Sequence, residues 1–373
     1  QATKSRRGSA IQTRGAAPPL EDDDAKKGAA HRRVTDSTHL QTKAESDILR
    51  VGFLGNSIMY YNDLPRVFAG LAASSATVSH ESCLRPGASL AELRAKGNGM
   101  RGHFAADADH GAPTVAALFG DFGPHVVVLN DYTQAPARPE SVAAGAATLV
   151  ESYAPLIAAA GCAVVLLQTY SYRRHAKRSD DIGAIPREFT EKLERGYAAY
   201  AEALSGALGN VEGTAAPACN GDTPSKRSGG GSTPTTTTPV ILEPRRRRTA
   251  DSKRVRVARV GAAFLAVHDE RPELWARLFS VDDLHPSPSG TFLAACVLHC
   301  AVFDAAPPAF ASSTAIARLW ADARHMQARG QPELPLPDVD DAAYLRDVAA
   351  RVVLDQVARG ADALAPTAWA HFD

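Results

Sequence analysis

Short apolar runs alternate along the chain with longer stretches of helical period. Runs with the length and β-branched character of buried strands lie at residues 48–54, 77–83, 125–129, 162–167 and 255–260. Helical patterns lie between or after them, at about 63–73, 139–159, 187–208, 262–267, 290–303, 314–329 and 342–359. Strands that alternate with helices favour a parallel sheet with helices on both faces. We therefore predict an α/β protein, a three-layer α/β/α sandwich of flavodoxin-like type.

Two segments depart from this alternation. Residues 1–47 mix charge, Gly, Pro and Ala without a sustained apolar period, and residues 213–254 are of low complexity. Both compositions are typical of disorder. We expect a disordered tail at 1–47, a domain at 48–305 that carries a disordered insertion at 213–254, and a helical extension at 306–373 packed on the domain.

Charge is distributed unevenly although the 373-residue chain has a formal net charge of +0. The insertion at 213–254 carries +5 and the first 48 residues +2, which leaves −7 on the presumed body. An acidic body is a poor match for a polyanion, so we expect no nucleic-acid partner. The basic run Arg245 to Arg248 lacks interleaved aromatic residues and favours a solvated insertion over a nucleic-acid patch.

Cysteine usage and apolar run length bear on location. The five cysteines are odd in number and form no CxxC pair, which suits a reducing compartment. No apolar run approaches the length of a membrane span, and no signal-peptide block opens the chain. We expect an intracellular protein without a membrane span; its oligomeric state is left open.

Candidate chemistry lies where predicted strands end or helices begin. Gly55-Asn56-Ser57 follows the first strand, where glycine permits a tight turn and Ser57 would stand at a helix N-terminus as nucleophile and N–H donor. A serine hydroxyl needs a base, and the base needs a carboxylate. Asp282 and His285 are three residues apart, so one turn can offer both. Asp283 competes with Asp282, but its position points it elsewhere.

Two further positions complete this set. Asn130 follows the 125–129 strand, where a side-chain amide could donate to a developing oxyanion. Gly87 follows the second strand and could add a backbone N–H. Carboxyl ends of parallel strands share one edge of a sheet, so residues this distant in sequence can form one site.

These residues resemble the SGNH (GDSL-like) hydrolase superfamily, whose conserved blocks occur in the same order. Gly55-Asn56-Ser57 is similar to the first block, Gly87 to the second, Val128 to Asp131 to the third, and Asp282 to Gly290 to the fifth. The resemblance spans about residues 48–305 without the insertion. Two positions depart from the pattern: Asn56 replaces the usual Asp, and Val128 replaces a Gly.

The resemblance implies a serine esterase that works through an acyl-enzyme. Ser57 would be the nucleophile, His285 the base and Asp282 its orienting carboxylate, with Ser57, Gly87 and Asn130 as oxyanion donors. No metal or organic cofactor is required. The substrate would be a small-molecule or carbohydrate ester, with a short acyl group on a polar alcohol. The alternatives are a lipase or lysophospholipase, an O-acyltransferase, or a non-catalytic glycan- or protein-binding relative.

Several other side chains have competing interpretations. A substrate pocket could involve positions that flank the nucleophile and the oxyanion donor, namely Asn56, Tyr60, Tyr61, Asp131, Tyr132 and Gln134. Ordinary packing is as good an explanation for the tyrosines and for Gln134. Two sets have helical metal-ligand spacing, His103/Asp107/His110 and Cys296/His299/Cys300. We interpret the first as solvated and the second as buried packing.

Overall fold

The computed structural model describes residues 48–102, 110–173, 185–212, 255–321, 323 and 333–358. The predicted tail at 1–47, the insertion at 213–254, His103 and Asp107 lie outside these residues. Within them, five strands form one parallel sheet in the order β2-β1-β3-β4-β5. The strands are β1 (Ile48–Gly55), β2 (Thr77–Leu84), β3 (Val126–Leu129), β4 (Ala163–Leu167) and β5 (Val255–Ala258). This is the flavodoxin-like order, so the predicted fold class is confirmed.

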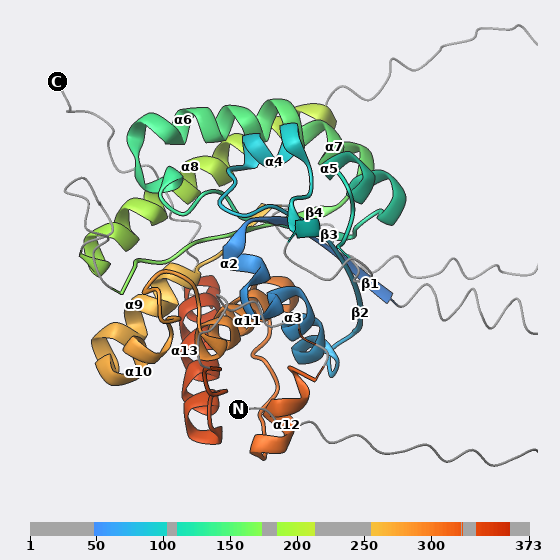
Figure 1. Ribbon diagram of the computed structural model, residues 1–373. Helices are drawn as coiled ribbons and strands as arrows, with labels where there is room; N and C mark the ends of the chain where they lie inside the picture. Colours follow the sequence, from blue (N-terminus) through green and yellow to red (C-terminus); the bar gives the residue numbers. More distant parts are fainter. Residues whose placement is uncertain are drawn as a thin grey trace, which may run out of the picture. The chain divides into compact units, whose positions relative to one another are not determined.

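Alternating side chains of the strands face two separate cores. Phe53, Val128 and Val165 belong to one core, and their neighbours Leu54 and Leu129 to the other. Because successive side chains of a strand point to opposite faces, an uninterrupted apolar run supplies both layers. Figure 1 shows the two helical layers on either side of the sheet.

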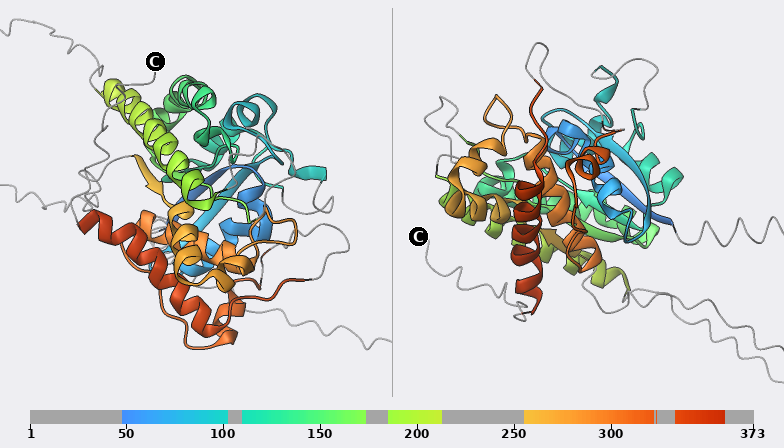
Figure 2. Two further views of the ribbon diagram at one scale, coloured as in Figure 1. Left: turned by 90° about the vertical axis from the view of Figure 1, so that its left-hand side faces the viewer. Right: turned by 90° about the horizontal axis from the view of Figure 1, so that it is seen from below.

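The helices divide between the layers by the core that they enter. The Phe53 face is covered by α2 (Ser57–Tyr60), η1 (Tyr61–Asp63), α3 (Leu64–Ala72), α9 (Val260–Glu270), α10 (Pro272–Arg277), α11 (Pro288–Phe303), α12 (Ser313–Arg318) and α13 (Val339–Ala358). The Leu54 face is covered by α4 (Leu90–Lys96), α5 (Val115–Ala117), η3 (Leu118–Phe122), α6 (Pro139–Thr148), η5 (Leu149–Tyr153), α7 (Ala154–Ala160) and α8 (Pro186–Glu212). Short η2 (Met100–Gly102) and η4 (Ala135–Ala137) lie in connections. Figure 2 shows α8 and α13 on opposite sides of the sheet.

Two predicted helices differ in detail from the structure. The 139–159 pattern is a continuous helix that changes to π geometry at η5. The 314–329 pattern yields only α12 among the described residues. By length and composition alone, Pro139–Ala160 could also cross a membrane. In the structure, however, Leu149, Tyr153 and Ile157 of this helix pack into the core.

The segment after residue 305 adds α13 to the outer side of α11. Asp341 near the start of α13 is buried and pairs with Arg271 at 3.0 Å and with Arg277 at 2.7 Å. Two guanidinium groups around one buried carboxylate fix this helix against α10.

Candidate active site

Ser57 is the first residue of α2, directly after β1 has reached the carboxyl edge of the sheet. The turn at this point is tight: a Cβ on Gly55 would meet the Cβ of Asn130 and the Sδ of Met59, each at 3.0 Å. Glycine is therefore required where β1 passes the end of β3. The Ser57 side chain is half-buried.

Asn56 holds the loops around Ser57 together. Its Nδ2 donates to the backbone oxygens of Ala88 and Asp131, both at 3.0 Å, and its Oδ1 accepts from the N–H of Ile58 at 3.2 Å. The side chain is buried and acts as a clamp between these loops, while a part in a substrate pocket stays a prediction. An aspartate has no N–H to offer the two carbonyls, which explains Asn56 where the resemblance leads one to expect Asp.

Gly87 is brought to the same edge by this clamp. The Asn56 bond to Ala88 and the Arg85 N–H bond to the Gly55 oxygen, at 3.0 Å, tie the loop after β2 to the end of β1. Gly87 itself has φ +62°, and a Cβ there would meet nothing within 4 Å. Backbone conformation, not crowding, favours glycine here.

Asn130 and Asp131 at the end of β3 are both buried. The Nδ2 of Asn130 donates to the Leu167 oxygen at 3.4 Å, and within the described ranges its Oδ1 has no hydrogen-bond partner. Asp131 accepts from the N–H of Leu90 at 2.9 Å, the N–H of Tyr132 at 2.8 Å and the hydroxyl of Tyr200 at 2.9 Å.

Asp131 is buried and supports α4 and α8 through these bonds, while its place in a substrate pocket stays a prediction. Burial raises the pKa of Asp131, and its three hydrogen bonds oppose that rise. Tyr132, the next residue, is 45 % exposed and is available to a ligand at the edge of the sheet.

Asp282 and His285 form a short, well-directed pair in the loop before α11. His285 Nδ1 lies 2.6 Å from Asp282 Oδ2, while Oδ1 accepts from the N–H groups of Leu284 and His285 at 3.0 and 2.9 Å. Burial alone would raise the pKa of Asp282, but hydrogen bonds from the His285 ring and from the backbone lower it to about 2. The carboxylate is therefore charged at neutral pH and holds Nδ1, which directs Nε2 away from it.

Asp283 takes no part in this pair. Its carboxylate binds the guanidinium of Arg173. The backbone N–H of Arg173 also donates to the backbone oxygen of Asp283 at 3.0 Å. Asp283 has φ +63°, a left-handed turn that separates the directions of the two neighbouring aspartates. The structure thus brings Asp282, and not Asp283, to His285.

Tyr61 and Asn62 connect the segment after Ser57 to the histidine loop. The Tyr61 ring lies on the His285 ring with centroids 3.8 Å apart and planes 3° apart. Asn62 Nδ2 donates to the Pro286 oxygen at 2.8 Å and to Thr291 Oγ1 at 3.0 Å. Asn62 was missed by the sequence analysis. The available signal was Asn62-Asp63 before a helix, because Asn and Asp tolerate the positive φ that both adopt, 52° and 53°.

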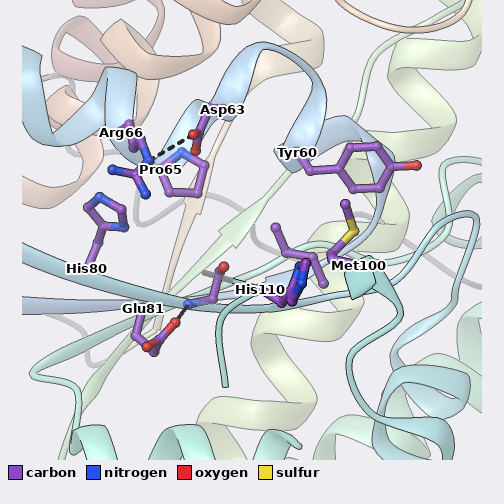
Figure 3. Close-up of a pocket in the computed structure, with 10 residues that line it drawn as sticks. Tyr60, Asp63, Pro65, Arg66, His80, Glu81, Met100 and His110 are labelled. Carbon is purple, nitrogen blue, oxygen red and sulfur yellow. Dashed lines mark hydrogen bonds and ion pairs between the residues drawn. The ribbon is translucent and has the colours of Figure 1, made fainter. Parts of the chain in front are cut away.

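A cavity lies beside Tyr60, on the side of α2 that faces β2 (Figure 3). Its polar lining includes Arg66, paired with Asp63 at 3.0 Å, and Glu81, which accepts from the N–H of Ser82 at 2.6 Å. Burial and then Tyr61 raise the pKa of Tyr60 to about 12, and the nearby Ser57 hydroxyl opposes the rise. Tyr60 therefore lies between the proposed nucleophile and a cavity of mixed charge.

Neither candidate metal set forms a site in the described residues. His110 lines the cavity beside Tyr60, and its proposed partners His103 and Asp107 lie outside the described ranges. Cys296, His299 and Cys300 are buried in α11, where His299 contacts Ser75 Oγ and the Ala305 oxygen, each at 3.1 Å. Among the described residues, no group of three or more His, Cys, Asp or Glu side chains could hold a metal ion.

The sheet order and the position of these side chains define an α/β sandwich with a polar site at its carboxyl edge. Two solved structures are similar. One is a protein from Slackia heliotrinireducens described as "a putative SGNH hydrolase", with 24% identity, TM-score 0.38, and coverage of 68% of this chain and 97% of that one. The other is a DUF4886 family protein from Bacteroides uniformis, with 12% identity, TM-score 0.44, and coverage of 84% and 96%.

Comparison with protein-family models and with curated proteins finds no match. The two structural likenesses are distant, with TM-scores below 0.5. The chemistry proposed below therefore rests on the side chains of the site itself.

Proposed function

We propose that the protein is a serine ester hydrolase in which Ser57 is the nucleophile, His285 the general base and Asp282 the residue that orients the base. The observation that carries the proposal is the Asp282–His285 pair. Its 2.6 Å contact engages Nδ1 and leaves Nε2 for proton transfer. Tyr61 and Asn62, which follow Ser57 by four and five residues, contact the same histidine loop.

The reaction would proceed in two halves. His285 Nε2 takes the Ser57 proton as Oγ bonds to the ester carbonyl carbon and the carbonyl electron pair moves to oxygen. Collapse of this intermediate breaks the bond to the alcohol, which leaves with the proton from His285. Water then attacks the acyl-enzyme with His285 again as base, and the acid is released. The proposed donors to the oxyanion are the N–H groups of Ser57 and Gly87 and the Asn130 amide.

The proposed substrate is a short acyl ester of a hydroxylated alcohol. The cavity beside Tyr60 carries a guanidinium and two carboxylates, and a lining with both donors and acceptors suits a polyhydroxyl compound better than a hydrocarbon chain.

Labelling with a fluorophosphonate tests the nucleophile. We expect covalent labelling of the full chain that Ser57→Ala abolishes and Ser141→Ala, at a half-buried serine of α6, leaves intact. Failure of folded protein to label would contradict the esterase and favour a non-catalytic binding protein.

A p-nitrophenyl ester series from acetate to long chains then tests the acyl group, and faster turnover of the long chains would contradict the short-acyl assignment.

A further inference from the structure

Tyr61 and His285 form a close, parallel ring stack. The two rings are 3° from parallel, and their centroids lie 3.8 Å apart. Tyr60, the last residue of α2, stacks on Tyr61 with ring centroids 5.5 Å apart. The η1 backbone that presents Tyr61 is held by the two Asn62 hydrogen bonds to Pro286 and Thr291. The η1 turn is thus anchored to the loop that carries His285, and Tyr61 of the same turn stacks on the His285 ring.

Asp282 restrains the imidazole of His285 from one edge only. The ring plane turns by rotation about the Cβ–Cγ bond, and the single hydrogen bond to Nδ1 limits this rotation but does not contact the face of the ring. Terminal torsions of this kind are broad. The Tyr61 ring lies against the imidazole face, so rotation about Cβ–Cγ would drive the edge of the imidazole into the tyrosine ring, and the stack therefore narrows that rotation further.

We propose that Tyr61 is a positioning residue for His285, fixing the plane of the imidazole so that Nε2 points at the Ser57 hydroxyl. The inference rests on the proposed esterase function and adds to it a residue that the resemblance does not assign. The ring of Tyr61, and not its hydroxyl, carries the effect, because the stacking face is formed by carbon atoms.

Three variants separate the ring from the hydroxyl and from general stability. In Tyr61→Leu we expect the kcat for p-nitrophenyl acetate to fall about 10-fold to 100-fold, the range seen when a reacting group is misplaced, with KM nearly unchanged. Tyr61→Phe keeps the stack and should retain wild-type kcat. The control Tyr344→Leu removes a half-buried tyrosine ring that contacts Glu270 and Arg271, and should leave kcat unchanged.

A spectroscopic signature tests the stack without reference to activity. Ring protons that lie over an aromatic face are shielded, so NMR of histidine-labelled protein should show upfield His285 ring signals in the wild type and Tyr61→Phe but not in Tyr61→Leu. His285→Gln assigns these signals. Equal loss of kcat in Tyr61→Phe and Tyr61→Leu, or His285 ring signals in Tyr61→Leu that stay as far upfield as in the wild type, would overturn the proposal.

Failure of the esterase function gives a different pattern. Without it, the wild type neither labels nor turns over ester, while the shielded signal and its loss in Tyr61→Leu persist. A working esterase in which Tyr61→Leu keeps its kcat instead contradicts only the positioning role.

Discussion

Replacing Asn56 by the aspartate found in the resembling family should destabilise this protein. Asn56→Asp keeps the cap on Ile58 but removes both Nδ2 donors, so the Ala88 and Asp131 carbonyls lose their partners in a buried setting. Each buried acceptor left unpaired costs about 1–3 kcal/mol, and we expect a total loss of about 3 kcal/mol in the free energy of unfolding. For a domain of this size that lowers Tm by about 6–12 °C.

The pH dependence of this loss has a defined sign. Burial beside carbonyl oxygens raises the pKa of the introduced carboxyl above its unfolded value of about 4. A group with a raised folded pKa stabilises least at high pH, so the deficit of Asn56→Asp should grow as pH rises from 5 to 8. Asn56→Ala loses the same two donors without adding a charge and provides the control. Thermal unfolding at both pH values is the assay, and a wild-type Tm for Asn56→Asp at pH 8 would refute the clamp.

Two further predictions concern carboxylates with defined partners. Asp282→Asn should lower kcat about 10³-fold to 10⁴-fold, because the amide no longer stabilises imidazolium. Steady-state kinetics measures the rate, and a cooperative unfolding transition above the assay temperature shows that the variant is folded. Since the pKa of Asp282 is lowered to about 2, the stabilisation given by its charged form is fully present above the unfolded pKa of about 4 and is lost as pH falls through 2. Any acid limb in the rate above pH 5 therefore belongs to another group. Asp341→Ala should lower stability by about 1–3 kcal/mol, less than for a fully buried pair because Arg271 and Arg277 are partly exposed. A calorimetric Tm equal to the wild type would contradict this account of α13.

The sheet was predictable because buried parallel strands are continuous apolar runs. The runs at 125–129 and 162–167 cover β3 and β4 to within a residue, and the observed strand order is that of the predicted flavodoxin-like type. Short helices with weak periodicity, such as α4 and α10, were not predicted. Their positions depend on caps and tertiary contacts, for example the Ser89–Glu92 capping box of α4.

The limits of prediction at the candidate site have a different origin. Sequence order places Ser57, Gly87, Asn130 and His285 at one edge, because all follow strands or precede helices. It does not distinguish a buried side chain from one that faces solvent. It does not show, for example, that Tyr200 and the Leu90 N–H donate to the oxygens of Asp131. The Asn62 connection depends on a left-handed turn and on partners far along the chain, which no local pattern contains.

The two hydrogen bonds of Asn62 have a consequence for how the molecule reaches its native state. They join positions 224 and 229 residues apart, nearly the full span of the domain. Contacts of such sequence separation form slowly, since the intervening chain must first be compacted. The neighbourhood of Ser57 and His285 is thus among the last parts to be completed, after the strands have paired. A nascent or partly folded chain holds both residues and still lacks the arrangement that the proposed chemistry needs.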